Sequence, residues 1–501
     1  MITRTLTALA LVFALALPAF AQPSRRSSEN NASEQQSEAK RLPADVTTDQ
    51  TLELPDRTLR FKATAGTIPI NNGEGKLQAE IAFIAYVRPD AGNRPVTFAV
   101  NGGPGAASAY LHLGAMGPWR LPLDNIQPSS SAQLVPNAET WLDFTDLVFV
   151  DPVGTGYSRF IASGDDVRKH FWSVDGDNDV LATFMRKWIE KNGRQASQKF
   201  IAGESYGGFR APRLAEKLNR DGVGINGLVM ISPVIDFGWR GNGRQSPLGW
   251  VARLPSMAAA ARETNAPFDR ASLRDAERYA AGEYLADLIR GERDAAAVER
   301  MSGRVAQLTG LDAALVKRNA GRVGASTFVR ELNRERGLIA SMYDVTVTAL
   351  DPNPGSASSN FEDPGLNGMR APLSTAMTDL YARVLRWKVE EPYELLNGRV
   401  SGRWDWGGGR STNDIVGTLR GIIAGDPRVR VLITHGATDL VTPYFENQMI
   451  IDQYPPFMHE RLKLSVYGGG HMFYSRDASR RALREDALQL YRAVEQTPPR
   501  G

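Results

Sequence analysis

One short segment constrains the fold of this chain more than any other. A strand-like apolar run at residues 200–202 is followed by Gly203-Glu204-Ser205-Tyr206-Gly207 and then by a helical run at 209–218. Glycines at the two ends of a G-x-S-x-G sequence permit a sharp strand-to-helix turn that exposes the serine hydroxyl at the carboxyl end of a sheet. The segment therefore predicts a sheet flanked by helices, with Ser205 as a candidate nucleophile.

The rest of the chain repeats this alternation of strand and helix. Further strand-like runs are expected at 79–87, 96–100, 147–150, 228–231, 429–434 and 462–467, and a closing helix at 478–494. Residues 241–374 differ, because they carry Ala- and Arg-rich helical patterns (257–262, 271–291, 295–308), no convincing strand, and a Pro/Gly/Ser-rich loop at 351–365 that leads to a helix at 375–389. We predict an α/β fold with a mostly parallel sheet, in which residues 46–240 and 375–501 form the core and 241–374 a helical cap.

Composition excludes several classes of protein. The 59 Lys and Arg against 56 Asp and Glu give a net charge of +3, too small an excess over 501 residues to indicate a nucleic-acid groove. Because the chain has no cysteine, disulfides, thiolate nucleophiles, iron–sulfur clusters and cysteine-based zinc sites are excluded. We expect neither a metal nor an organic cofactor. The sequence gives no indication of oligomeric state.

The amino terminus is typical of an exported protein. Residues 1–21 carry one positive charge, an apolar run and a final Ala-Phe-Ala, so we predict a signal peptide cleaved after Ala21. The alternative is a membrane anchor, but the run is shorter than the roughly 20 apolar residues that span a bilayer, and we expect no membrane insertion after cleavage. Residues 22–45 are polar and predict a flexible leader. Export without cysteine favours a bacterial periplasm, and secretion is the alternative.

A serine nucleophile needs a base and an orienting acid. His471 follows an apolar strand on a glycine-rich loop and is the predicted base; His435 at another strand end is better explained as a packed residue, and His112, His170 and His459 lack this context. Asp439 follows the strand at 429–434 and is either a capping residue or the acid. The order Ser205, Asp439, His471 is that of the α/β-hydrolase fold and favours the acid.

The loop Asn101-Gly102-Gly103-Pro104-Gly105 directly follows the strand predicted at 96–100. Its glycines allow the backbone to approach a substrate and to offer N–H groups to an oxyanion. A phosphate-binding loop is one alternative, but the lysine and Ser/Thr of a P-loop are absent. A purely structural turn is the other alternative.

Five motifs in this order resemble the serine carboxypeptidase family: NGGPG at 101–105, DPVGTGYS at 151–158, GESYGG at 203–208, HGATDLVTP at 435–443 and GGGHM at 468–472. The resemblance implies an α/β-hydrolase fold with Ser205, Asp439 and His471 as triad. It also implies that the amides of Gly103 and Tyr206 form the oxyanion hole. Asn101, Gly102 and Glu204 would bind the terminal carboxylate of a peptide substrate.

The chain departs from this family at two positions. Ala99 and Ala115 stand where the family usually has a tryptophan and a glutamate, and that glutamate would share a hydrogen bond with the equivalent of Glu204. The terminal carboxylate of a peptide and the Glu204 carboxylate repel each other unless one of them holds a proton. Binding of the peptide terminus beside Glu204 therefore requires acidic pH or a raised pKa of Glu204. A salt bridge from Glu204 to Arg210 is the structural alternative.

The resemblance predicts a serine-type carboxypeptidase that works through an acyl-enzyme on Ser205. An exported esterase, acyltransferase or aminopeptidase on the same fold is the first alternative, because the fold does not fix the substrate. A non-catalytic binding protein is the second, and the presence of nucleophile, base, acid and oxyanion loop argues against it.

Overall fold

The computed structural model describes residues 41–89, 92–241, 245–263, 268–356 and 362–496. The predicted signal peptide and residues 22–40 of the predicted leader lie outside these residues. Residues 41–45 are packed: Leu42 is buried, its amide donates to Glu80 over 2.9 Å, and Asp45 pairs with Lys191 over 2.6 Å. The predicted flexible leader is therefore wrong at its carboxyl end, because these contacts join residues distant in sequence.

In the described residues, ten strands form one sheet in the order β1-β2-β3-β7-β4-β9-β10-β13-β14, with β8 paired to β3. The strands from β7 onward are parallel, and β1, β2 and β3 extend the sheet in antiparallel pairs. The parallel strands are β7 (Asp146–Val150), β4 (Val96–Val100), β9 (Lys199–Glu204), β10 (Gly227–Ile231), β13 (Arg430–Gly436) and β14 (Leu462–Tyr467). The others are β1 (Val46–Glu53), β2 (Thr58–Asn71), β3 (Leu77–Val87) and β8 (Arg159–Phe160). The strands predicted at 96–100 and 462–467 coincide with β4 and β14.

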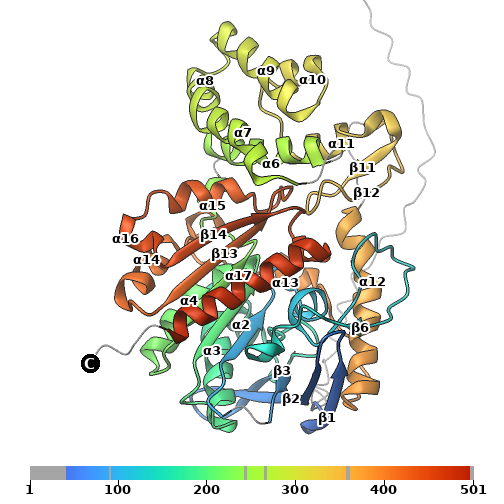
Figure 1. The fold of residues 1–501 in the computed structure, drawn as a ribbon, viewed down its shortest axis with the longest axis vertical. Coiled ribbons are helices and arrows are strands. Elements are labelled where there is room, and N and C mark those ends of the chain that lie inside the picture. The colour runs from blue at the N-terminus through green and yellow to red at the C-terminus, as the bar shows by residue number, and fades with distance from the viewer. Residues whose placement is uncertain (1–40, 90–91, 242–244, 264–267, 357–361, 497–501) are drawn as a thin grey trace, which may run out of the picture. The chain divides into compact units, whose positions relative to one another are not determined.

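Helices cover both faces of the sheet. Alternate residues of β4 enter two different cores: Phe98 and Val100 pack in one, and Ala99 in the other. The first core lies under α3 (Val174–Lys191) and α4 (Tyr206–Arg220), and the second under α17 (Asp477–Glu495), which lies across the sheet in Figure 1. The predicted layers are confirmed.

The insertion is mainly helical. It contains α6 (Leu248–Glu263), α7 (Arg274–Tyr279), α8 (Leu285–Arg290), α9 (Ala295–Thr309), α10 (Ala313–Arg318) and α11 (Ala325–Glu331). Their apolar residues form a third core together with Leu440 and with Tyr444 of α15 (Tyr444–Ile451), and Figure 1 shows these helices grouped beyond α15. The insertion thus packs directly on the loop that carries Asp439.

Two details of this region differ from the prediction. A hairpin of β11 (Leu338–Ala340) and β12 (Thr348–Leu350) was missed, because strands of three residues leave too little pattern in the sequence. The helix predicted from 375 begins earlier, as α12 (Pro364–Asp379). Asp363 caps this helix by accepting from the amides of Gly365 and Leu366, and Pro364 occupies its first turn. The Asp-Pro-Gly sequence is therefore a helix start and not part of a loop.

The remaining helices are short: α1 (Ala109–Leu111), α2 (Asp165–Phe171), α5 (Gly238–Gly241), α13 (Gly398–Gly402), α14 (Val416–Gly425) and α16 (Pro456–His459). The two-residue strands β5 (Trp119–Arg120) and β6 (Val135–Pro136) pair with each other in antiparallel orientation.

A buried ion pair fixes α4 against α3. Arg210, fully buried on α4, donates from Nε to Asp177 of α3 over 2.6 Å and from Nη1 to the carbonyl oxygen of Asn101 over 2.6 Å. One guanidinium group therefore holds the helix after Ser205, the neighbouring helix and the loop after β4 together.

We expect Asp177→Asn to lower the free energy of unfolding by about 3–5 kcal/mol, because it leaves the Arg210 charge buried without its partner. Urea unfolding measures this change. The matched control is Asp175→Asn, since Asp175 forms an exposed pair with Arg213 between the same two helices. A control variant as destabilised as Asp177→Asn would contradict the assignment.

Candidate active site

Ser205 lies at the turn between β9 and α4. Its φ of 59° and ψ of −119° are unusual for a residue with a side chain. A Cβ at residue 203 would lie 2.0 Å from the carbonyl oxygen of Gly207, and a Cβ at 207 would lie 2.2 Å from the carbonyl oxygen of Val100. Glycine is therefore required at both positions, and the predicted strand-turn-helix geometry around Ser205 is present.

The predicted oxyanion donors come from two segments in close contact. Tyr206 is the first residue of α4, where a backbone N–H has no partner within the helix. A Cβ on Gly102 would lie 2.5 Å from the Tyr206 nitrogen, so the loop after β4 passes directly beside this amide. Gly103 follows in that loop and lines the same cavity as Ser205.

The structure brings Asp439 and His471 into contact. The Nδ1 atom of His471 lies 2.7 Å from Oδ2 of Asp439, and both residues are almost completely buried. Oδ1 of Asp439 accepts from the amides of Val441 and Thr442, over 2.8 and 2.9 Å. Asp439 therefore both caps its own loop and binds the imidazole, which unites the two alternatives considered for it.

The charge on Asp439 is stabilised locally. Burial by itself would raise the pKa of Asp439, but the charge and hydrogen bond of His471, together with hydrogen bonds from Thr442, lower it below the ordinary value. Because the ionised Asp439 binds Nδ1 of His471, the opposite ring nitrogen of His471, Nε2, is left to act as a base.

Ser205 and His471 line a cavity of about 160 Å³. The other predicted site residues, Asn101, Gly102, Gly103, Glu204 and Tyr206, line it as well. All lie at or after the carboxyl ends of parallel strands, where open α/β sheets place their ligand sites. Tyr343 and Leu366 bring residues from the predicted insertion into the wall.

Glu204 is buried in this wall and bonded to neutral donors. Its Oε2 accepts from the Tyr474 hydroxyl over 2.6 Å, and the side chain of Asn101 also hydrogen-bonds to it. Burial raises the pKa of Glu204, although these two hydrogen bonds and the charge of His471 act in the opposite direction. The proposed salt bridge from Glu204 to Arg210 is wrong, because Arg210 pairs with Asp177.

His435 lies buried at the end of β13, where its Nε2 lies 2.8 Å from the Asn447 side-chain nitrogen. Its interpretation as a packed residue is confirmed.

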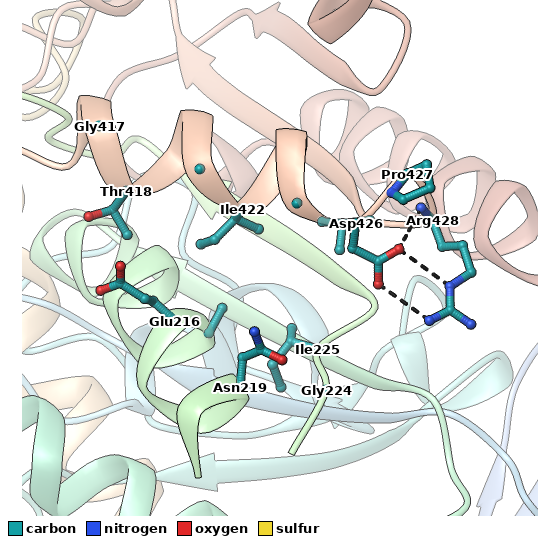
Figure 2. Close-up of a pocket in the computed structure, with 14 residues that line it drawn as sticks. Glu216, Asn219, Gly224, Ile225, Gly417, Thr418, Ile422, Asp426, Pro427 and Arg428 are labelled. Atoms are coloured by element: carbon teal, nitrogen blue, oxygen red, sulfur yellow. Dashed lines mark hydrogen bonds and ion pairs between the residues drawn. The ribbon is translucent and has the colours of Figure 1, made fainter. Parts of the chain in front are cut away.

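A larger groove of about 840 Å³ lies elsewhere, between α4 and α14 (Figure 2). It is lined by Glu216 and Asn219 near the end of α4, by Gly417 and Thr418 of α14 and by Asp426, which binds Arg428 beside it. Asn219 is 14 residues beyond Ser205 on a helix that rises 1.5 Å per residue, so the groove lies about 20 Å from the serine.

Sequence reasoning missed Asp344, which joins the loop that carries Asp439 to the loop that carries His471. Its Oδ1 accepts from the Thr438 hydroxyl over 3.0 Å, and its Oδ2 from the Gly470 amide over 3.1 Å. These two donors immediately precede Asp439 and His471 in the sequence.

Backbone contacts on either side of Asp344 reinforce this link. The Leu440 amide donates to the Met342 carbonyl over 3.1 Å, and the His471 amide donates to that of Tyr343 over 2.5 Å. A Cβ on Gly470 would lie 2.0 Å from the Tyr343 oxygen, which shows how closely the segments pack. The insertion therefore contributes to the positions of both Asp439 and His471.

In the described part of the chain, no group of three or more His, Asp or Glu residues is arranged to hold a metal ion. None of its helices combines the length and the apolar character that a membrane crossing needs.

The family model for serine carboxypeptidase matches residues 56–237, which include the loop after β4 and the turn at Ser205. Serine carboxypeptidase-like 34 of Arabidopsis thaliana is 28% identical over 202 residues, covering 38% of either chain. The pheromone-processing carboxypeptidase kex1 of Schizosaccharomyces pombe is 32% identical over 182 residues, covering 35% of this chain and 31% of its own. The chain thus spans less than half the length of the curated relatives it matches.

Among solved structures, Kex1(delta)p, a prohormone-processing carboxypeptidase from Saccharomyces cerevisiae, superposes with a TM-score of 0.56. The match covers 86% of this chain and 91% of that one at 16% identity. The predicted α/β-hydrolase fold, a mostly parallel sheet flanked by helices, is confirmed.

We expect Ser205→Ala and His471→Ala each to lower kcat on an activated ester by about 10⁴-fold, because the first removes the attacking hydroxyl and the second removes its base. Stopped and continuous ester assays on folded protein measure this. His435→Ala is the control: it removes a buried histidine and should lower stability without a comparable loss of kcat. Near-normal turnover by folded Ser205→Ala would refute the assignment of the nucleophile.

We expect Asp344→Ala to lower kcat by roughly 10- to 100-fold with a smaller change in KM, because small displacements of catalytic groups are costly. The control is Asp351→Ala, which breaks the buried pair of Asp351 with Arg330 in the same insertion. If both variants lose stability equally but only Asp344→Ala loses kcat, Asp344 positions the triad. Equal kcat in the two variants would show that Asp344 is merely structural.

Proposed function

We propose that this chain is a serine-type carboxypeptidase that removes carboxyl-terminal residues from peptides. The observation that carries the proposal is the single cavity that holds Ser205 and His471 together with Asn101 and Glu204. Ser205, with His471 as its base, can attack a carbonyl carbon. Asn101 and Glu204 can hold the terminal carboxylate of the peptide, one residue away from that carbonyl group. The family match over residues 56–237 supports the same activity.

In the proposed reaction, Nε2 of His471 takes the proton of the Ser205 hydroxyl as its oxygen attacks the scissile carbonyl. The amides of Gly103 and Tyr206 stabilise the oxyanion. The histidine then gives the proton to the leaving amine, and an acyl-enzyme on Ser205 remains. Water, activated by the same imidazole, releases the shortened peptide and restores the hydroxyl.

The terminal carboxylate would meet the Asn101 side chain, the Gly102 amide and Glu204. Two carboxyl groups attract each other when one of them is protonated, and burial raises the pKa of Glu204. Recognition of the free carboxyl terminus therefore depends on a proton at Glu204.

We also propose that the protein is exported, most simply to a bacterial periplasm. The charged start, apolar run and Ala-Phe-Ala end of residues 1–21 support this proposal. Mass determination of the mature amino terminus tests it, with Gln22 expected as the first residue.

The activity is tested by mass spectrometry of the purified protein with one peptide that has a free carboxyl terminus and with its amidated twin, at pH 4.5 and 7.5. Stepwise loss of terminal residues from the free peptide alone supports the proposal. Loss of residues from the amino terminus, or hydrolysis of blocked esters without cleavage of either peptide, would instead favour an aminopeptidase or an esterase.

We expect KM for a free-carboxyl peptide to rise with pH as Glu204 loses its proton, whereas KM for the amide should stay flat. Because the pKa of Glu204 is raised, this rise should begin above the range where glutamate ordinarily titrates. Glu204→Gln keeps a neutral side chain at all pH values and should abolish the rise. A rise that persists in Glu204→Gln would contradict the carboxylate site.

A further inference from the structure

One of the two side chains that hydrogen-bond to Glu204 is a tyrosine that lies outside all five motifs. Tyr474 lies in the short helix η8 (Phe473–Ser475), three residues after His471, and is completely buried. Its hydroxyl donates to Oε2 of Glu204 over 2.6 Å. One short segment therefore supplies both the base and the group that holds Glu204.

Gly114 makes room for this tyrosine. Gly114 lies in the helical turn η1 (His112–Met116), and a Cβ on it would lie 2.6 Å from Cε2 of Tyr474. The ring therefore rests directly on the backbone of residue 114. Ala115, the next residue, stands where the resemblance to serine carboxypeptidases leads one to expect a glutamate that bonds to Glu204.

We propose that Tyr474 is a positioning residue for the terminal carboxylate of the substrate, because its hydroxyl holds the carboxyl group of Glu204 in the cavity wall. The inference rests on the proposed carboxypeptidase function. By donating to Oε2, the phenol fixes the orientation of the Glu204 carboxyl group, so that its remaining hydrogen-bonding capacity serves a ligand in the cavity. The subsite thus uses one carboxyl group and one phenol.

The groups around Glu204 leave it as the titrating carboxyl group of the subsite. Among the described residues that line the cavity, Glu204 is the sole carboxylic acid, and the cation Arg410 also lines it, with its guanidinium over the rings of Phe237 and Trp406. Tyr110 and Tyr343 face it as neutral phenols, since burial raises the pKa of both, that of Tyr343 to about 12. The charges of His471 and Asp439 act on it from the catalytic pair, in opposite directions.

The test is Tyr474→Phe, which keeps the ring on Gly114 and removes one oxygen atom. We expect kcat/KM for a free-carboxyl peptide to fall by roughly 2- to 10-fold at acidic pH, mostly through KM, as the loss of one hydrogen bond implies. The loss on a blocked ester, which has no terminal carboxylate, should be much smaller.

A second readout separates positioning from packing. The hydrogen bond from Tyr474 lowers the pKa of Glu204, so its removal should raise that pKa. The pH at which KM for the free-carboxyl peptide rises should therefore move upward in Tyr474→Phe. A purely structural change would not move it.

The matched control is Tyr467→Phe, because Tyr467 also donates to a carboxylate, Asp486, over 2.6 Å but does not line the cavity. This variant should keep both the substrate preference and the pH profile. Equal effects on peptide and ester, or an unmoved pH profile, in Tyr474→Phe would overturn the role of Tyr474. A wild-type enzyme that shows no preference for free carboxyl termini would instead refute the proposed function, and this inference with it.

Discussion

The structure depends on the close approach of the turn after β9 to the loop after β4. A side chain on Gly207 would collide with the carbonyl oxygen of Val100, and one on Gly102 would collide with the Tyr206 amide. Because the two backbone segments are in direct contact, the serine, the candidate oxyanion donors and the candidate carboxylate-binding residues line one small cavity. Arg210 holds this contact by binding both Asp177 and the Asn101 carbonyl from a fully buried position.

The insertion acts on the same site from the other side. Asp344 binds the residues that precede Asp439 and His471, and it also accepts from Arg476, which pairs with Glu263 of α6. The loops that carry Asp439 and His471 are therefore held partly by residues that the core itself does not provide. Changes in the insertion can reach the chemistry through Asp344 and the substrate through Tyr343 in the cavity wall.

Features that depend on residues close together in the chain could be predicted from the sequence. The turn at Ser205 needs glycines at fixed spacing, and strands such as β4 and β14 are continuous apolar runs, so both were located correctly. Tyr474 and Asp344 could not be found in this way, because their partners Glu204 and Gly470 are distant in sequence and no spacing rule links them. The start of α12 could have been found, since Asp363 and Pro364 form an ordinary helix cap that the surrounding loop-like composition obscured.

Mapping a fluorophosphonate adduct by mass spectrometry tests the central claim, that Ser205 is the nucleophile activated by His471, most directly. Lys199 and Arg210 flank the serine, so trypsin releases it in a single peptide, residues 200–210. We predict one adduct, on Ser205 of this peptide, formed rapidly by the wild type and lost in His471→Ala. An active enzyme that carries its adduct on another residue, or none on this peptide, would contradict the claim.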